Sequence, residues 1–294
     1  MFSPERNFTD WKLTGFGNAP AYLFETIEST HKLMKSKAIA GEIGPGTLFV
    51  ADSQSNGHGR HERTWDSPAG KNLYFNILIP LDGIPPNRFA QITQVTALTF
   101  AEVFNEIQEA STLENASASK ITVKWPNDIL YGKSKFCGIL AEVVYVKIPA
   151  STGMTNENAP RPALNMGIGI NVNSDPEDYA HIGRAVTTLK AIVGRPINRE
   201  KILQTLIGNL ERAIGQFRAF GINPWVTAWK RMDQFIGARG TIIVNNHCTD
   251  QNRNSGEGAI KKTGRIIDMQ DDGSLLFQCD DGKIETVISA DLEI

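Results

Sequence analysis

The 294-residue sequence has few cysteines and lacks any apolar run that would direct it to, or through, a membrane. Its three cysteines, Cys137, Cys248 and Cys279, lie far apart in the chain. The first residues, MFSPERNFTDWK, contain no apolar run of the signal-peptide kind, and no later stretch is long enough to span a bilayer. We therefore expect reduced thiols instead of a disulfide framework, a cytoplasmic location and no membrane partner.

The sequence also lacks a large charge of either sign. Lys and Arg total 30 and Asp and Glu total 32, so the net charge is −2 at pH 7. This balance gives no global reason to expect nucleic-acid binding, and any basic segment needs a local explanation. With 41% hydrophobic and 21% charged residues, the chain has an ordinary globular composition and is long enough for two domains.

Apolar periodicity and turn residues predict a mixture of helices and strands up to about residue 235. Ser29 or Thr30 stands where an N-cap of the first helix is expected. The remaining turn signals include Gly132, at the centre of a predicted hairpin. Strands are predicted at 47–52, 72–80, 119–125, 128–146 (the hairpin) and 163–173, and helices at 31–40, 86–108, 199–220 and 224–232.

The composition changes from about Ala238. Short β-type runs then alternate with turn signals, and Asp272-Gly273 and Asp281-Gly282 are typical of hairpins. These last residues, about 57 of them, predict a small all-β barrel.

The segment SNGHGRHERTW, residues 55–65, contains almost nothing that a core requires. Its two glycines let a backbone come close to a ligand. Arg60 and Arg63 are permanent cations whose forked donors match phosphate or carboxylate oxygens, and Trp65 offers a face on which a base can stack. Together these residues suggest a loop that orders over a nucleotide phosphate. Glycine and arginine alone are explained as well by a solvated basic loop.

Three further features are compatible with a functional site, but none of them identifies the reaction by itself. KWPND, residues 124–128, is a polar turn after a strand. Lys135 is either an edge-strand gatekeeper or a cation pointing into a cleft; strand alternation puts it on one face with Cys137, and Phe136 with Gly138 on the other. GIGIN, residues 167–171, places two glycines inside a strand, which marks either a bulge or something lying against the backbone.

Taken in order, these segments resemble those of biotin protein ligases, the biotin–[acetyl-CoA-carboxylase] ligases. The resemblance covers roughly residues 20–233, and the tail is similar to that family's small SH3-like domain. It implies an α+β fold, with a mixed-sheet catalytic domain over 1–235 and an all-β SH3-like domain over 236–294. The motifs that carry it are Ser29-Thr30, Gly-x-Gly-Arg at 57–60, the segment Trp65 to Tyr74, Lys124 to Asp128, Lys135-x-x-Gly138-Ile-Leu-x-Glu142 and Gly167-x-Gly-x-Asn171.

The resemblance implies site residues position by position. Lys135, which bridges biotin's carboxylate and the reacting phosphate, and Arg60 are the implied catalytic residues. The implied biotin-binding residues are Ser29, Thr30, Gln54, Gly57, Arg60, Lys135, Gly138 and Gly167. The implied nucleotide-binding residues are Arg63, Trp65, Lys124, Asn127, Asp128, Gly169 and Asn171. The positions of Lys124, Asn127 and Asp128 also lie on the metal side, but no metal ligand is assigned.

The implied reaction uses biotin, ATP and Mg²⁺. Biotin's carboxylate attacks the α-phosphorus of ATP to give biotinyl-5′-AMP and diphosphate, and a lysine of a biotin carboxyl carrier domain then takes the biotin. The mixed anhydride is sensitive to water, so residues 55–65 are interpreted as a lid. The motif at Ser29 leaves no room for the winged helix-turn-helix of bifunctional members, so we expect no DNA binding. Oligomeric state stays open, a homodimer included.

Three positions depart from the family pattern. The family usually has arginine where this chain has His58, asparagine where it has His31, and glycine where it has Glu62. If the usual arginine helps to retain the adenylate, His58, charged only part of the time near pH 7, implies weaker retention.

Two other functions compete. A lipoate ligase or octanoyl transferase could use the Cys137 thiol beside Lys135 as an acyl carrier, although KWPND, the Gly-x-Gly-Arg loop and the β-rich tail favour the biotin ligase. The second is a non-catalytic biotin or nucleotide sensor, against which Lys135 and Arg60 argue.

Overall fold

The computed structural model describes residues 7–60, 63–111, 120–147, 160–244 and 260–294. Seven strands form one mixed sheet with the order β1-β2-β3-β7-β6-β5-β4. The first pair, β1 and β2, is parallel and every other pair is antiparallel. The strands are β1 (Ala21–Ile27), β2 (Leu48–Gln54), β3 (Leu73–Pro80), β4 (Ile121–Lys124), β5 (Asp128–Tyr131), β6 (Ser134–Val146) and β7 (Arg161–Ile170).

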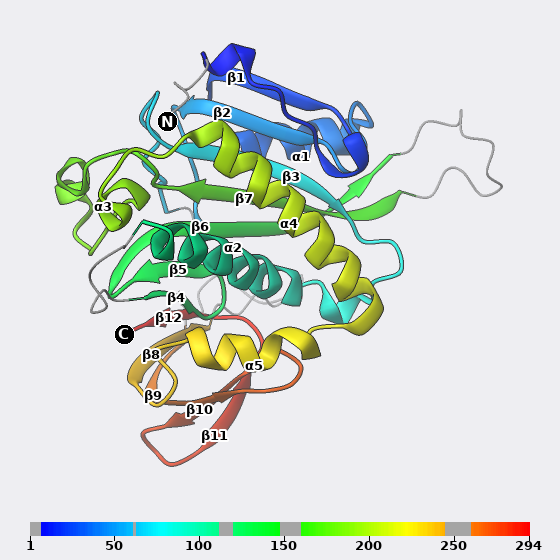
Figure 1. Ribbon diagram of the computed structural model, residues 1–294. Helices are drawn as coiled ribbons and strands as arrows, with labels where there is room; N and C mark the ends of the chain where they lie inside the picture. Colours follow the sequence, from blue (N-terminus) through cyan, green and yellow to red (C-terminus); the bar gives the residue numbers. More distant parts are fainter. Residues whose placement is uncertain (1–6, 61–62, 112–119, 148–159, 245–259) are drawn as a thin grey trace, which may run out of the picture.

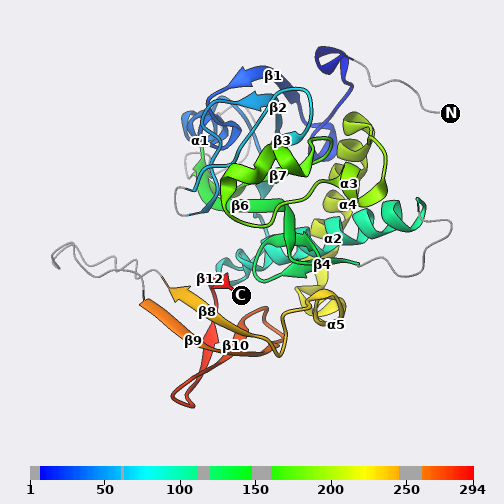
Figure 2. The ribbon, with the colours of Figure 1, turned by 90° about the vertical axis from the view of Figure 1, so that its left-hand side faces the viewer.

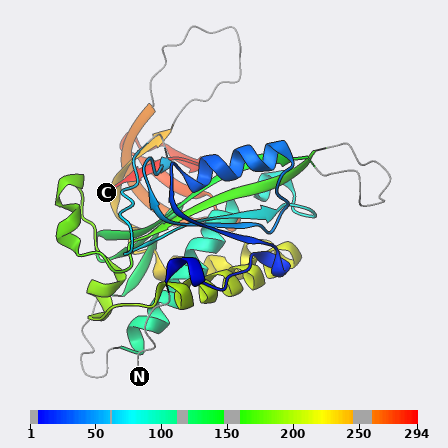
Figure 3. The same cartoon turned by 90° about the horizontal axis from the view of Figure 1, so that it is seen from above.

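Helices cover both faces of this sheet. Helix α1 (Thr30–Ala40) packs on β3, β6 and β7, whereas α2 (Gln91–Glu109) packs on β4, β5 and β6 and against α4 (Arg199–Phe220). Figure 3 shows α1 on one side of the sheet and α4 on the other. The short helix α3 (Leu189–Val193) contacts α2, and α5 (Asn223–Met232) packs against α2 and β4 before the chain enters its C-terminal part (Figure 1).

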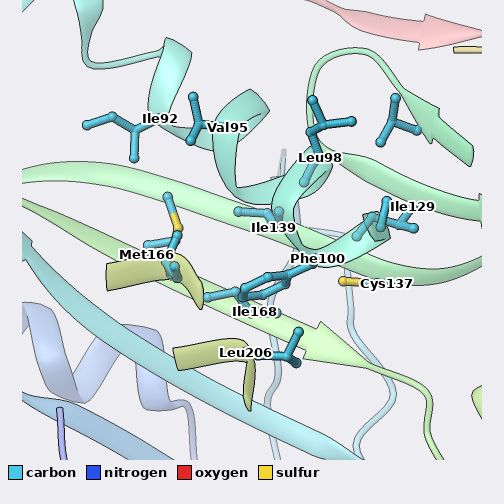
Figure 4. Packing of buried hydrophobic residues seen from close by; sticks show 14 of the residues in the cluster. Ile92, Val95, Leu98, Phe100, Ile129, Cys137, Ile139, Met166, Ile168 and Leu206 are labelled. Atoms are coloured by element: carbon cyan, nitrogen blue, oxygen red, sulfur yellow. The ribbon is translucent and has the colours of Figure 1, made fainter. Parts of the chain in front are cut away.

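The main core lies between the sheet and α2. Phe100 and Phe104 of α2 are fully buried, and the Phe104 ring meets the ring of Phe136 edge to face at 5.2 Å. Met166 and Ile168 of β7 face the same layer (Figure 4). One side of β7 is therefore committed to the core, and its other side faces α1.

The C-terminal residues form a separate five-stranded antiparallel sheet of order β11-β10-β9-β8-β12. Figure 2 shows it beyond the β4 edge of the larger sheet. Its strands are β8 (Arg239–Val244), β9 (Ile260–Met269), β10 (Leu275–Cys279), β11 (Ile284–Val287) and β12 (Asp291–Glu293). Gly273 and Gly282 take positive φ, 80° and 89°, in the two predicted hairpin turns. The expected fold class, a mixed-sheet α+β part followed by a small all-β part, is confirmed; the boundary at 235/236 stays a prediction.

Most predicted elements are present, with shifted ends. Ser29 is the N-cap of α1, and its Oγ accepts a hydrogen bond from the N–H of Lys32 at 3.4 Å. Helix α2 begins at Gln91, after a separate 3-10 turn over Pro86–Arg88, instead of at residue 86. The sequence prediction misses β1, α3 and β12. In the described residues, no helix is long and apolar enough to cross a membrane.

One expectation about side-chain direction is wrong. The pairing of β5 with β6 shifts register: Leu130 faces Lys135 but Ile129 faces Cys137, so Phe136 is an extra residue in β6. Such a bulge reverses the alternation of faces beyond it. Cys137 is therefore fully buried in the core beside Phe136, and Lys135 shares its face with Gly138.

Candidate functional site

A cavity opens on the side of the larger sheet that faces α1. Its empty space, counted together with the open solvent at its mouth, is about 760 Å³. Strands β6 and β7 form its floor, and the loop after β2 lies across it. The lining residues are Ser29, Thr30, His31, Gln54, His58, Gly59, Arg60, Arg63, Thr64, Trp65, Asn76, Asn127, Asp128, Lys135, Gly138, Ile139, Leu140, Gly167, Ile168, Gly169, Arg184 and Asp291.

One end of the cavity is a network of uncharged polar side chains. Gln54 Oε1 accepts hydrogen bonds from the N–H and the hydroxyl of Thr30 at 2.9 and 3.0 Å, and Gln54 Nε2 donates to Ser67 Oγ at 3.1 Å. The Thr30 hydroxyl also lies 2.7 Å from Asn76 Oδ1. Asn76 Nδ2 in turn donates to Asn165 Oδ1 at 2.8 Å. Because these groups hold one another in place, they present donors and acceptors in fixed directions.

His31 connects this network to charged residues behind it. Its Nδ1 lies 3.1 Å from Asn76 Nδ2, and its Nε2 lies 3.4 Å from a carboxylate oxygen of Glu142. Glu142 also pairs with Lys35 at 2.5 Å. Burial lowers the pKa of His31 in spite of Glu142, so the imidazole is neutral near pH 7. A neutral ring can accept from Asn76 at Nδ1 and donate to Glu142 at Nε2.

The floor of the cavity requires glycine. A Cβ on Gly169 would lie 2.4 Å from the ring of Trp65, and a Cβ on Gly138 would lie 2.9 Å from it. A Cβ on Gly167 would meet Asn76 and His31 at 3.1 Å. Both β7 glycines keep regular register with β3 and β6, so they mark a close approach to the backbone and not a bulge.

The other end of the cavity is charged. Lys135 Nζ lies 2.6 Å from Asp128 Oδ1 and 5.3 Å from the centre of the Trp65 ring. The β6 bulge turns Lys135 toward this face. The side chains of Lys135 and Asp128 are 19% and 23% exposed, so an anion that enters meets an ammonium group already partly removed from water.

The loop arginines lie beside this pair and are held from outside the larger sheet. Arg60 Nη1 donates to the carbonyl of Ala290 at 3.1 Å and lies 3.5 Å from Asn127 Oδ1. Arg60 and Arg63 both form ion pairs with Asp291, at 3.4 and 2.9 Å. Asn127 is fixed through its side-chain amide, which donates to the carbonyl of Ile139. The cationic end therefore combines residues from three distant parts of the chain.

Two polar ring nitrogens at the cavity have no hydrogen-bond partner among the described residues. They are Nε2 of His58 and Nε1 of Trp65, and both are buried. Buried polar atoms are nearly always paired in a functioning state, so both nitrogens are available to a ligand.

Known proteins resemble this chain. The chain matches the model of the Biotin/lipoate A/B protein ligase family over residues 23–154, a little under half of its length. It is 28% identical over 273 residues to the Bifunctional ligase/repressor BirA of Bacillus subtilis, covering 92% of this chain and 72% of the relative. It is 26% identical over 238 residues to the Biotin–[acetyl-CoA-carboxylase] ligase of Mycobacterium tuberculosis, covering 80% and 79% of the two chains.

Solved structures share the fold of this chain. The biotin protein ligase from Aquifex aeolicus in complex with biotin and ATP superposes with a TM-score of 0.67, at 24% identity over 93% of this chain and 97% of that one. The biotin protein ligase from Leishmania major in complex with biotinyl-5-AMP gives 0.54 at 20% identity, over 91% and 98%. At these identities the likeness shows the fold alone.

The structure brings most of the sequence-predicted site residues together. Those that line the cavity are Ser29, Thr30, Gln54, Arg60, Arg63, Trp65, Asn127, Asp128, Lys135, Gly138, Gly167 and Gly169. Asn171 lines a second cavity of about 320 Å³ on the other side of Trp65. Gly57, a buried residue of the loop, lines neither of these two cavities, and a Cβ on it would lie 2.5 Å from the Trp65 carbonyl oxygen.

Lys124 is not brought to either cavity. Its ammonium group lies 5.9 Å from the centre of the Phe235 ring, and burial lowers its pKa. Its nucleotide-side role stays a prediction. Glu62, one of the departures from the family pattern, and Cys248 lie outside the described residues.

Sequence reasoning misses several cavity residues. Asn76 had a signal, because it is a polar residue in the middle of the apolar run NLYFNILIP. Arg184, which lines both cavities, and Asp291 had none. They reach the site through tertiary packing, and nothing near them in the chain distinguishes them from surface residues.

Proposed function

We propose that this protein is a biotin–protein ligase: it activates biotin with ATP to biotinyl-5′-AMP and transfers the biotin to a lysine of a biotin carboxyl carrier domain. The observation that carries the proposal is a single cavity with a neutral hydrogen-bonding network at one end and Lys135, Arg60 and Arg63 at the other. Biotin has the matching polarity, with an uncharged ureido ring at one end and a carboxylate at the other.

The polar end suits the ureido ring. This group offers two N–H donors and one carbonyl acceptor, and Thr30, Gln54 and Asn76 hold both kinds of partner. The family resemblance assigns Ser29, Thr30 and Gln54 to biotin, and the network adds Asn76 and His31. Biotin's carboxylate then points along the glycine floor toward Lys135.

The charged end suits the first half-reaction. Biotin's carboxylate oxygen attacks the α-phosphorus of ATP, the bond from that phosphorus to the bridging oxygen breaks, and diphosphate leaves. Negative charge concentrates on the phosphoryl oxygens in the transition state, where Lys135 and Arg60 stabilise it. Asp128, 2.6 Å from Lys135, keeps the ammonium aimed before the substrates arrive.

The second cavity suits the nucleoside. Trp65 lines this cavity as well as the main one, as Lys135 and Arg184 do, and Asn171, Tyr179, Ile182 and Val186 are among the residues that line the second cavity alone. These residues supply aromatic and apolar faces and one side-chain amide, which is the combination that a purine binds.

Magnesium enters with ATP as part of the co-substrate. Mg²⁺ is commonly bound by one or two carboxylates together with substrate phosphates, and Asp128 is a carboxylate in the cavity that fits this role. Among the described residues, no group of three or more His, Cys, Asp or Glu side chains is arranged to hold a metal ion. The ion neutralises phosphate charge.

In the second half-reaction a lysine amine of the carrier attacks the carbonyl carbon of biotinyl-5′-AMP. An amide forms, the mixed anhydride bond breaks, and AMP leaves. We propose that the carrier docks by adding a strand to the larger sheet. Among the described strands, β5 pairs with β6 only as far as Gly138, so the rest of β6 has no neighbouring strand on that side.

The position of Cys137 does not favour the competing acyl-transfer function. Cys137 is fully buried in the core, lines neither cavity, and burial raises the pKa of its thiol. A thioester at this position would have no access to the cavity. Absence of DNA binding, a homodimer, the cytoplasmic location and the lid movement of residues 55–65 stay predictions from the sequence.

Incubation of the protein with biotin, MgATP and a carrier domain, read by mass spectrometry, tests the proposal. We expect one lysine of the carrier to gain the mass of biotin minus one water. Biotin-dependent exchange between ATP and diphosphate distinguishes a ligase from a sensor: binding of both ligands without exchange would contradict the proposal.

A further inference from the structure

The C-terminal sheet supplies a carboxylate to the loop that lies across the cavity. Asp291 is the first residue of β12, and its side chain is only 8% exposed. One of its oxygens lies 3.4 Å from Nη1 of Arg60 and the other 2.9 Å from Nη2 of Arg63. The neighbouring carbonyl of Ala290 accepts a hydrogen bond from Arg60 as well.

The two sides of this contact differ in how firmly they are held. Strand β12 pairs with β8 over all three of its residues, and Leu292 is buried in the shared core. The loop is anchored beside the end of β1 by the N–H groups of Ser55 and Asn56. From Gly57 to Trp65 the backbone hydrogen bonds found for its described residues run within the loop, such as Gly59 N–H to the Arg63 carbonyl at 2.6 Å. The carboxylate is thus the fixed partner, and the arginines take their direction from it.

The contacts leave part of each guanidinium available. An arginine has five N–H donors, and the contacts of Arg60 to Ala290, Asn127 and Asp291 all use Nη1. Among the described residues no contact to its Nε or Nη2 is found, so these donors can reach a ligand in the cavity. An anion bound there and Asp291 can therefore share the same cation from opposite edges.

We propose that Asp291 is a positioning residue for biotinyl-5′-AMP. Asp291 directs Arg60 and Arg63 at the anionic part of the adenylate and so keeps the intermediate in the cavity until the carrier arrives. This inference rests on the proposed function and extends it: retention depends on the C-terminal sheet as well as on the loop. It also compensates for His58, which offers no permanent charge at the loop.

The direct test measures the rate at which the full-length protein releases preformed biotinyl-5′-AMP, chased with an excess of unlabelled biotin. Asp291→Asn keeps the size of the side chain and removes its charge. We expect about tenfold faster release, because the two arginines lose the carboxylate that directs them. Asp291→Glu should restore most of the retention. Glu293→Gln, which alters the other acid of β12, should leave the rate as in the wild type.

The possible results separate the two claims. A wild-type protein that forms no biotinyl-5′-AMP would remove the proposed function and this inference with it. A wild-type protein that forms the adenylate, and an Asp291→Asn variant that releases it no faster, would overturn only the role of Asp291. If the amide variant does not fold, Arg63→Gln removes the 2.9 Å ion pair from the half-exposed side; release at the wild-type rate from that variant would overturn the inference too.

Discussion

The two glycines of β7 predict opposite effects of the same small substitution. A Cβ at position 169 would lie 2.4, 2.5 and 2.8 Å from three atoms of the Trp65 ring. Ordinary van der Waals contact begins near 3.4 Å, so the ring has to move by about 1 Å. Overpacking of this size costs about 1–3 kcal/mol. Because Trp65 lines both cavities and is an implied nucleotide-binding residue, we expect Gly169→Ala to raise the KM for ATP by roughly 10- to 100-fold and to change the KM for biotin little.

Gly167→Ala is the matched variant, two residues away on the same face. Its Cβ would touch Asn76 and His31 at 3.1 Å, a milder overlap at the polar end. We expect the KM for biotin to rise and the KM for ATP to stay near that of the wild type. Steady-state biotinylation of a carrier domain, with each substrate varied in turn, measures both effects.

A second variant checks the cause. Trp65→Leu removes the ring that the added methyl group meets, so Gly169→Ala should cost much less in a Trp65→Leu background than in the wild type. Equal costs in both backgrounds, or Gly169→Ala and Gly167→Ala variants that affect the same substrate, would refute the reasoning that assigns the two ends of the cavity.

Three other residues give expected outcomes that separate catalysis from stability. Lys135→Met should reduce biotin-dependent ATP–diphosphate exchange by about 10²–10³-fold with the fold intact by circular dichroism; unchanged exchange would contradict its role. Cys137→Ser should keep biotinylation but lower the melting temperature, because a buried hydroxyl without a partner costs about 1–3 kcal/mol. A folded variant that no longer transfers biotin would support the thioester route instead. Burial raises the pKa of Asp233 to about 6, above its unfolded value, so its protonated form stabilises the fold and this contribution is lost as pH rises from about 4 to 6. Relative to Asp233→Asn, the wild type should lose about 3 kcal/mol over that range, measured by urea unfolding; parallel pH curves would refute this.

The fold followed from local patterns, and the errors arose where tertiary structure overrode them. The apolar runs at 48–54 and 73–80 predict strands because burial and β-propensity agree there. The run AYLFETI of β1 was missed because its burial alternates irregularly along an edge strand. The face on which Cys137 lies was predicted wrongly because a one-residue bulge leaves no signature in the sequence.

The site residues also divide into those that local sequence could predict and those that depend on tertiary packing. Glycines, arginines and the tryptophan of residues 55–65 could be assigned chemistry because the residue types restrict what they can do. Asp291 could not, since its partners lie about 230 residues earlier in the chain, and an aspartate on a short strand has no distinguishing neighbours. The burial of Lys124 against Phe235 was equally hidden, because it depends on how α5 packs against β4.

Strand β7 contributes to both the hydrophobic core and the cavity, and it therefore links ligand binding to thermal unfolding. Met166 and Ile168 anchor one surface of the strand among the side chains of α2 (Figure 4), while the intervening glycines offer the opposite surface to ligands. Because both surfaces belong to the same backbone, one surface cannot become mobile while the other stays ordered. Heating should therefore abolish ligand binding and cooperative folding together, in one transition, and bound biotin and nucleotide should raise the temperature of that transition.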